Sequence, residues 1–122
     1  MTVMRPLVTI VDDDPSVRES LPDLLVELGF SARAFSSAEE FLTSGCIGSA
    51  ECLILDMTMP GMSGLDLQRE LTQNGRDIPI VFITASRDEV TRELVLSRGA
   101  VDCLFKPFSD SVLLAALHAA FQ

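Results

Sequence analysis

Three consecutive aspartates, Asp12, Asp13 and Asp14, follow the apolar run Leu7–Val11 in the sequence IVDDDP. Carboxylates a few ångströms apart repel each other by ~1 kcal/mol in water, and by several times more near a protein surface. Asp14 precedes Pro15, which is typical of a helix N-cap followed by a first-turn proline. Asp12 and Asp13 are therefore the acids that are candidates for binding a cation.

Polar side chains also follow three further apolar runs. Asp56 comes after CLIL, Thr84 after IVFI, and Lys106, the single lysine, after VDCLF. If these runs are parallel strands of one sheet, their carboxyl ends meet at one edge. Neighbouring strands lie ~4.8 Å apart, so four adjacent ends cover only ~15 Å. We therefore expect the acids, the hydroxyl and the ammonium group to face one pocket.

This set of side chains suits phosphoryl transfer. Closely spaced carboxylates are hard oxygen ligands of the kind that Mg²⁺ prefers, and a bound ion would offset their repulsion. A carboxylate can then attack phosphorus and form an acyl phosphate. Lys106 and the metal would neutralise charge on the phosphoryl oxygens, and the hydroxyl of Thr84 would donate a hydrogen bond to them.

Five β-prone runs alternate with five helical patterns along the chain. The runs are Leu7–Val11, Ala32–Phe35, Cys52–Leu55, Ile80–Ile83 and Val101–Phe105. The first, third and fourth are almost wholly apolar, as strands covered on both faces are, whereas the second contains a charge and suits an edge. The alternation predicts an α/β fold with a doubly wound, five-stranded parallel sheet in the order 2-1-3-4-5 and five helices.

Capping residues and glycines predict where the helices begin and end. The predicted helices run from Asp14 to Gly29, from Ser37 to Gly45, over 65–74, over 88–98, and from Ser109 to the end of the chain. Ser37 and Glu40 are expected to form a capping box. Pro22 lies inside the first helix and predicts a bend, because it cannot donate a hydrogen bond to the carbonyl of Arg18.

Composition argues against several classes of function. The net charge of −9, with eight arginines and one lysine, disfavours direct nucleic-acid binding by this chain. No run approaches the ~18 apolar residues of a membrane span, and the N-terminus lacks a signal-peptide cleavage site, so we expect a cytoplasmic protein without membrane contact. Cys46, Cys52 and Cys103 show no CxxC spacing and are expected to pack, and His118 is expected on a surface or interface.

Four motifs together resemble the receiver domains of two-component response regulators. They are VDDD at 11–14, ILDMTMPGMSG at 54–64, FITA at 82–85 and FKPF at 105–108, and GAVDCLFKPF is most similar to the FixJ-like subgroup. The resemblance covers essentially the whole chain. Residues 1–122 are therefore expected to form one receiver domain, with the flavodoxin/CheY-like form of the predicted fold.

The resemblance implies a role for each polar residue. Asp56 would be the phosphoacceptor. Mg²⁺ would be bound by Asp13, by Asp56 and by the main-chain carbonyl of Thr58, with Asp12 acting through a metal-bound water. Lys106 would pair with the phosphoryl group and Thr84 would move to bind it. The bond between Lys106 and Pro107 is cis in many such domains.

The implied function is a signalling switch rather than an enzyme. A sensor histidine kinase would supply the phosphoryl group, and the domain would change the surface formed by its fourth helix, fifth strand and fifth helix. This surface would control an output, here transcription through a DNA-binding domain absent from the chain, and would be the site of a possible homodimer. Candidate contacts on it are Leu94, Val95, Leu113, Leu117 and Phe121.

One position departs from the family pattern. Cys103 stands three residues before Lys106, where these domains usually carry a tyrosine or phenylalanine that turns inward as the threonine moves. We expect the readout to be muted, or carried instead by Phe105 or Phe108. The resemblance also places Thr58 and Ser86 where small hydroxyl side chains would leave room for water and so affect the lifetime of the phosphoryl group.

Three alternatives remain open. The chain could be a stand-alone single-domain regulator instead of part of a transcription factor. A phosphatase of the haloacid-dehalogenase kind also uses a strand-end aspartate and Mg²⁺, but it needs a second aspartate at the position of Thr58. A flavin mononucleotide binder would need a first loop rich in glycine and hydroxyl groups, whereas DDDP would repel phosphate.

Overall fold

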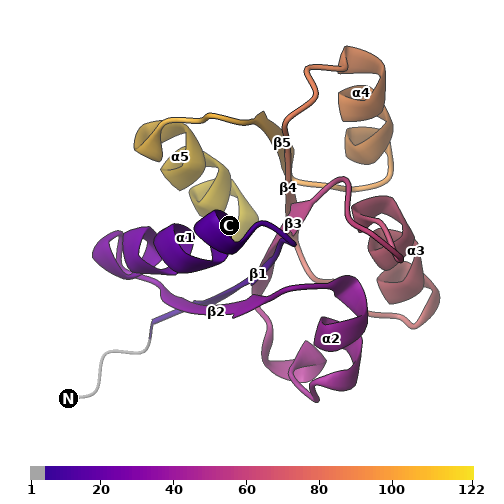
Figure 1. The fold of residues 1–122 in the computed structure, drawn as a ribbon, viewed down its shortest axis with the longest axis horizontal. Coiled ribbons are helices and arrows are strands. Elements are labelled where there is room, and N and C mark those ends of the chain that lie inside the picture. Colours follow the sequence, from indigo (N-terminus) through magenta and orange to yellow (C-terminus); the bar gives the residue numbers. More distant parts are fainter. Residues whose placement is uncertain (1–4) are drawn as a thin grey trace.

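The computed structural model describes residues 5–122, which fold around a parallel five-stranded sheet (Figure 1). The strand order is β2-β1-β3-β4-β5, and every neighbouring pair is parallel. The strands are β1 (Leu7–Val11), β2 (Ser31–Phe35), β3 (Cys52–Asp56), β4 (Ile80–Thr84) and β5 (Asp102–Phe105). The predicted order is confirmed, and strands β3 and β4 each extend one residue further than expected, to Asp56 and Thr84.

Helices cover both faces of the sheet. They are α1 (Pro15–Glu27), α2 (Ala38–Thr43), α3 (Gly64–Gln73), α4 (Glu89–Ser97) and α5 (Asp110–Ala120), and a short 3₁₀ turn, η1 (Ile47–Ser49), precedes β3. Figure 1 shows α1 and α5 on one face and α2, α3 and α4 on the other. Within residues 5–122, no helix is long and apolar enough to span a bilayer. The signal-peptide prediction rests partly on residues 1–4, which lie outside the described range.

Two apolar layers hold the helices on the sheet. The layer under α1 and α5 includes Ile10, Leu25 and Leu117, and the layer under α2, α3 and α4 includes Phe41 and Phe82. All residues of β3 and β4 are buried, as expected for central strands, whereas β2 is buried only at its last residue. Because both faces of the sheet are covered, the strand order is held in place, and with it the set of strand ends that lie side by side.

Helix capping agrees with the sequence in part. The Asp14 carboxylate accepts a hydrogen bond from Ser16 N at 2.9 Å, as predicted for an N-cap, and α1 continues without interruption across Pro22. The Ser37 hydroxyl accepts from Glu40 N at 3.0 Å, but the predicted capping box is wrong in its second half. The Glu40 carboxylate accepts from Ser36 N at 3.1 Å instead, one residue earlier, where it also reaches the Ser36 hydroxyl.

A complete capping box, which was not predicted from the sequence, occurs at α3. The Ser63 hydroxyl accepts from Asp66 N and the Asp66 carboxylate accepts from Ser63 N, both at 3.1 Å. These bonds fix the start of α3 directly after the loop that leaves β3. The loop between Asp56 and α3 is therefore held at both of its ends by regular structure.

Gly64, the first residue of α3, packs tightly against the end of β3. A Cβ at this position would collide with the carbonyl oxygen of Asp56 and lie 3.1 Å from both Met57 Cα and a ring carbon of Phe82. The contact with Asp56 involves main-chain atoms, which cannot rotate away as the end of a flexible side chain could. Only glycine allows α3 to approach the strand end this closely.

We expect Gly64→Ala to lower the free energy of unfolding by about 1 to 3 kcal/mol, because the added methyl group forces α3 away from β3. Urea unfolding of the two proteins measures the difference. Gly48→Ala is the matched control, since the nearest atom to its Cβ would be Arg76 Nη1 at 4.0 Å. Equal losses at the two positions would contradict the close approach.

Candidate functional site

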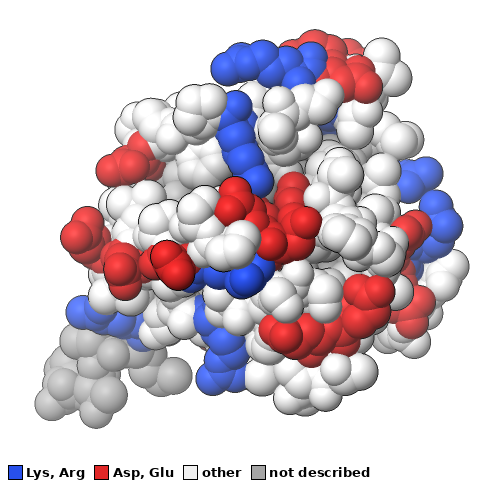
Figure 2. All heavy atoms as spheres, in the orientation of Figure 1, with Lys and Arg blue, Asp and Glu red and all other residues white. Residues whose placement is uncertain are grey.

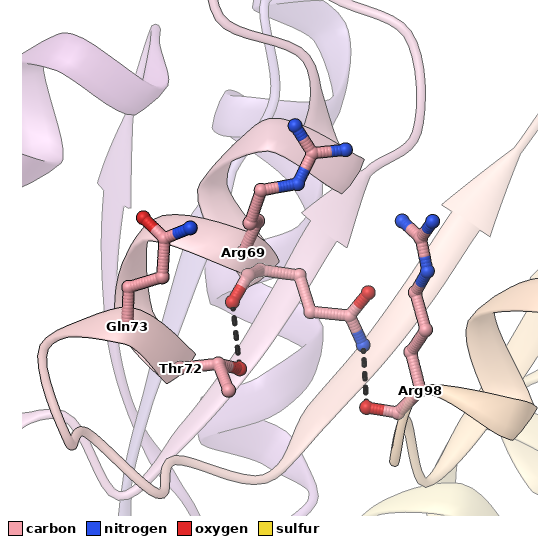
Figure 3. Close-up of a pocket in the computed structure, with 5 residues that line it drawn as sticks. Arg69, Thr72, Gln73 and Arg98 are labelled. Atoms are coloured by element: carbon pink, nitrogen blue, oxygen red, sulfur yellow. Dashed lines mark hydrogen bonds between the residues drawn. The ribbon is translucent and has the colours of Figure 1, made fainter.

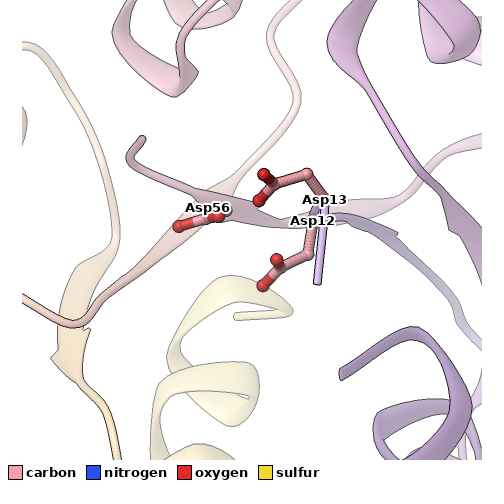
Figure 4. A group of neighbouring side chains, drawn as sticks. All are labelled: Asp12, Asp13 and Asp56. Carbon is pink, nitrogen blue, oxygen red and sulfur yellow. The ribbon is translucent and has the colours of Figure 1, made fainter. Parts of the chain in front are cut away.

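Three aspartates meet where β1 and β3 end. One carboxylate oxygen from each of Asp12, Asp13 and Asp56 lies within 4.8 Å of the others. Figure 4 shows Asp12 and Asp13 extending from the end of β1 towards Asp56. The side chains of Asp12 and Asp56 are buried, with 0% and 7% of each residue exposed, while Asp13 is exposed. The structure thus brings together the three acids that the sequence placed at two strand ends.

Lys106 reaches the same acids from the end of β5. Its Nζ donates a hydrogen bond to Asp12 Oδ2 at 3.1 Å and lies 4.0 Å from Asp56 Oδ1. Its main-chain N donates to the carbonyl of Thr84 at 2.8 Å, which ties the end of β5 to the end of β4. The bond between Lys106 and Pro107 is cis, as the resemblance implied. Figure 2 shows acidic side chains gathered near the centre of this face, next to a basic one.

A pocket of about 380 Å³ opens above these groups. It is lined by Asp13, Asp14, Asp56, Thr58, Thr84, Ala85, Ser86 and Lys106. Thr84 is buried, and its Oγ1 accepts a hydrogen bond from Ser86 N at 3.1 Å. Accepting this bond leaves the hydroxyl proton of Thr84 free to donate. The pocket therefore combines carboxylates, one ammonium group and hydroxyl groups, among them the buried Thr84 with its proton free to donate.

Burial and like charge make Asp56 an unusual acid. They raise its pKa to about 7, chiefly because burial disfavours the carboxylate and next because the charge of Asp12 repels it. Lys106 lowers this pKa but does not cancel the other two effects. Asp14 differs, because its hydrogen bonds with Ser16 hold its pKa below the ordinary value. The charged form of Asp14 is thus stabilised as the helix cap, whereas the charged form of Asp56 is destabilised relative to an ordinary aspartate.

The donor set suits a hard divalent cation. Carboxylate oxygens from two segments face one another, and the one ammonium group in the pocket leaves negative charge uncompensated. Mg²⁺ prefers oxygen ligands and commonly takes only one or two protein carboxylates while keeping several waters. The fit between the acidic cluster and such an ion is therefore good.

Two supporting residues were not predicted. Arg18 Nη1 donates to the main-chain carbonyl of Asp12 at 3.0 Å, and Glu39 Oε2 accepts from Met62 N at 3.1 Å. The first bond holds the loop after β1 onto α1, and the second holds the loop after β3 onto α2. Neither residue carries a sequence signal, because the spacing between partners is set by how the helices pack on the sheet.

Three predicted contacts of a partner surface are wrong. Val95, Leu113 and Leu117 are 0% exposed, because the apolar faces of α4 and α5 pack onto the sheet. Phe121 stacks on Phe30 with ring centroids 5.7 Å apart, so it too is engaged within the chain. Leu94 alone among the five candidates is exposed, at 39%. The exposed apolar side chains of α4 and α5 also include Val90 and Val112, which were not among the predicted contacts.

Cys103 is a core residue. It is 3% exposed, it packs in the layer under α2, α3 and α4, and burial raises the pKa of its thiol. Cys52 is also buried and Cys46 is half-buried against the same layer as Cys103, so the predicted packing role of the cysteines is confirmed. His118 lies exposed in the last turn of α5, as expected. Phe105 is half-buried, with the guanidinium carbon of Arg87 5.6 Å from its ring centroid.

The pKa of Asp56 predicts a pH-dependent stability. Its folded value of about 7 exceeds the ordinary value of 3.8, so the folded state holds this proton more tightly than the unfolded state does. Stability from this group is therefore greatest below about pH 4 and is lost as pH rises towards 7. Without metal, the stability advantage of Asp56→Asn over wild type is expected to grow with pH. We expect the difference in free energy of unfolding between the two proteins to increase by about 1 to 2 kcal/mol from pH 5 to pH 8.

Thermal unfolding in a chelator at both pH values measures this gain. Asp23→Asn removes an exposed carboxylate of α1 and serves as the control, for which we expect no comparable change. Parallel pH profiles for wild type and Asp56→Asn would show that Asp56 is not strained by its neighbours.

A family model described as the response regulator receiver domain matches residues 8–118. Response regulator protein TodT of Pseudomonas putida is 43% identical over 122 residues, which are 100% of this chain and 54% of TodT. Transcriptional regulatory protein FixJ of Azorhizobium caulinodans is 37% identical over 113 residues, covering 93% of this chain and 54% of FixJ. The chain spans about half the length of these curated relatives.

A solved structure agrees with the sequence matches. The structure of response regulator StyR superimposes with a TM-score of 0.87 and 44% identity, over 96% of this chain and 59% of that chain. The family match covers most of the chain, and the strand order and the acidic pocket are those expected from the resemblance. The chain therefore belongs to the family of response regulator receiver domains.

Proposed function

We propose that this chain is a phosphorylation-dependent switch of two-component signalling, in which Asp56 accepts a phosphoryl group from a sensor histidine kinase. The observation that supports this most directly is the 4.0 Å approach of Lys106 Nζ to Asp56 Oδ1 inside a pocket that also contains Asp12 and Asp13. Family membership supports the same conclusion. The chain would act as a signalling protein and not as an enzyme.

In the proposed transfer, a carboxylate oxygen of Asp56 forms a bond to phosphorus. The bond between phosphorus and a histidine nitrogen of the kinase breaks, and the nitrogen keeps the electron pair. The ammonium group of Lys106 would neutralise the charge of one phosphoryl oxygen, and the hydroxyl of Thr84 would donate a hydrogen bond to another. Thr84 can do this because its Oγ1 only accepts a bond, from Ser86 N, in the present arrangement.

Mg²⁺ is the proposed cofactor. Asp13, Asp56 and the main-chain carbonyl of Thr58 would hold it directly, and Asp12 would act through water. When bound, the ion supplies positive charge that offsets carboxylate repulsion and stabilises the transferred group. The raised pKa of Asp56 supports this assignment, because the acid needs a nearby cation to stay ionised at neutral pH. Thr58 and Ser86 border the pocket and are proposed to affect the lifetime of the phosphoryl group.

The output is proposed to be control of transcription. FixJ, a similar protein, is named a transcriptional regulatory protein, and the relatives are about twice as long as this chain. Residues 1–122 would then be the receiver domain of such a regulator, with DNA bound by another region and not by this acidic surface. A stand-alone regulator remains the alternative. The cytoplasmic location stays a prediction.

The surface of α4, β5 and α5 is the proposed site of homodimerisation. Val90, Leu94 and Val112 are 76%, 39% and 47% exposed there. A groove of about 480 Å³ on the same surface is lined by Val112 and by residues of β5, including Phe105. Thr84 pairs with Phe105 across β4 and β5, and Arg87 of the next loop lies over the ring of Phe105. A movement of Thr84 would therefore reach this surface through Phe105, which replaces the aromatic residue absent at Cys103.

Incubation with acetyl phosphate and Mg²⁺ tests the acceptor. We expect the wild type to gain the mass of one phosphoryl group, and we expect Asp56→Ala or addition of a chelator to abolish the gain. Asp14→Ala is the matched control, because Asp14 lines the same pocket but is engaged as the helix cap. Intact mass spectrometry measures each product. Equal phosphorylation of Asp56→Ala and the wild type would refute the assignment.

A second experiment tests the readout. We expect Phe105→Leu to be phosphorylated as well as wild type but to dimerise about threefold more weakly once phosphorylated, because Arg87 loses its aromatic partner. Phe108→Leu, which alters the layer under α1 and α5, is the comparison. Sedimentation of the beryllofluoride-treated proteins measures dimerisation. If only Phe108→Leu weakens the dimer, the path through Phe105 is wrong.

A further inference from the structure

A second polar pocket, of about 420 Å³, lies between α3 and the end of α4 (Figure 3). It is lined by Gln68, Arg69, Thr72, Gln73 and Arg98. None of these residues lines the acidic pocket. Four of them belong to α3 after its first turn, whereas Asp56 lies before the loop that leads into α3. The pocket is therefore separate from the proposed phosphorylation site.

Gln68 is a buried amide whose hydrogen bonding is incomplete. The residue is 4% exposed, and its Oε1 has no hydrogen-bond partner within the described part of the chain. Its Nε2 donates to the main-chain carbonyl of Arg98 at 3.4 Å, which requires the amide nitrogen on that side and leaves the oxygen as the unpaired acceptor. Buried polar atoms nearly always have a hydrogen-bond partner, so we expect a donor from outside the described chain to bind this oxygen.

Arg69 and Arg98 line the same pocket as this amide. Neither Arg69 nor Arg98 forms a side-chain hydrogen bond or salt bridge with any residue in the range 5–122, where the three salt bridges involve Arg92 and Lys106. Figure 3 shows both arginine side chains extending towards the same end of the pocket. Both guanidinium groups are thus available to one ligand in this pocket. Guanidinium groups bind carboxylates and phosphates through paired N–H donors.

We propose that this pocket binds a small anion that carries a carboxylate or a phosphate group beside an N–H or O–H donor. The anionic group would pair with Arg69 and Arg98, and the donor would satisfy Gln68 Oε1. The volume of about 420 Å³ is within the range of small-molecule sites. Thr72 would stay as it is, since its hydroxyl already donates to the Gln68 carbonyl at 2.9 Å. The proposal does not depend on phosphorylation of Asp56.

The ligand would contact both α3 and the C-terminal end of α4. Arg98 is the C-cap of α4 and leads into β5, while Gln68 and Arg69 lie on α3. At present the weak bond from Gln68 to the Arg98 carbonyl is the side-chain hydrogen bond that joins these elements in the described chain. A bound anion would add contacts on both sides, so we expect it to stabilise the folded state.

Titrations of the whole chain, followed by amide NMR shifts, test the proposal with two pairs of probes. N-acetylglycine is compared with acetate, and inorganic phosphate with sulfate, because only the first of each pair carries a donor beside or within the anionic group. We expect at least one donor-bearing probe to shift Gln68 and Arg98 resonances and to bind about tenfold more tightly than its partner. The two pairs distinguish a carboxylate ligand from a phosphate ligand.

Variants separate the site from general charge effects. We expect Arg69→Gln and Arg98→Gln each to weaken binding about tenfold, whereas Arg5→Gln, which removes the same charge from an exposed position before β1, leaves it unchanged. Gln68→Met should abolish the preference for the donor-bearing probe while keeping or raising Tm, because it removes an unpaired acceptor. Phosphorylation by acetyl phosphate should be unaffected in all four variants.

Three results would overturn the proposal. Equal binding of both members of each pair would show that Gln68 Oε1 does not take part. Equal weakening by Arg5→Gln would show that the net charge of the chain, and not the pocket, governs binding. No shift of Gln68 or Arg98 at millimolar concentrations of any probe would show that a water, and not an anion, satisfies the amide.

Discussion

Repulsion among buried carboxylates at the ends of β1 and β3 is the constraint around which this structure is organised. The sheet order places these strands side by side, so Asp12 and Asp56 cannot separate without breaking the ladder that pairs Val11 with Leu55. Lys106 relieves part of the repulsion through its 3.1 Å bond to Asp12. Burial of the carboxyl group, and next the remaining repulsion from Asp12, raise the pKa of Asp56 to about 7. A cation and a phosphoryl group are the natural partners of such an arrangement.

The rest of the fold keeps the acids from moving apart. Two apolar layers bury both faces of the sheet, and the close approach of Gly64 to the Asp56 carbonyl fixes the loop beyond Asp56. Arg18 and Glu39 hold the two acidic loops to neighbouring helices through main-chain hydrogen bonds. These contacts hold the carboxylates close together despite their repulsion. Binding of a cation would therefore reduce the repulsion more easily than a rearrangement of the chain.

Charge is distributed unevenly over this acidic chain. The acidic pocket lies where the strands end, and the arginine-lined pocket lies further along α3, with no lining residue in common. The acidic pocket has more carboxylates than cationic groups, while the second pocket is lined by two arginines and by no carboxylate. The two would therefore attract ligands of opposite sign. Helix α3 carries Gln68 and Arg69 of the second pocket, and it follows the loop that leaves Asp56.

Local chemistry determined most of the fold and the acidic site. The apolar runs followed by Asp12, Asp56, Thr84 and Lys106 were enough to predict the sheet and the acidic pocket. Parallel strands bring their carboxyl ends to one edge of the sheet whatever the details of side-chain packing. The tertiary structure alone decided which helix side chains are buried and which polar groups lack partners. Val95 and Leu117 read as surface contacts in the sequence but face the sheet, and the unpaired oxygen of Gln68 appears only when α3 and α4 are placed together. These features depend on distances between segments far apart in the chain, which periodicity and spacing do not encode.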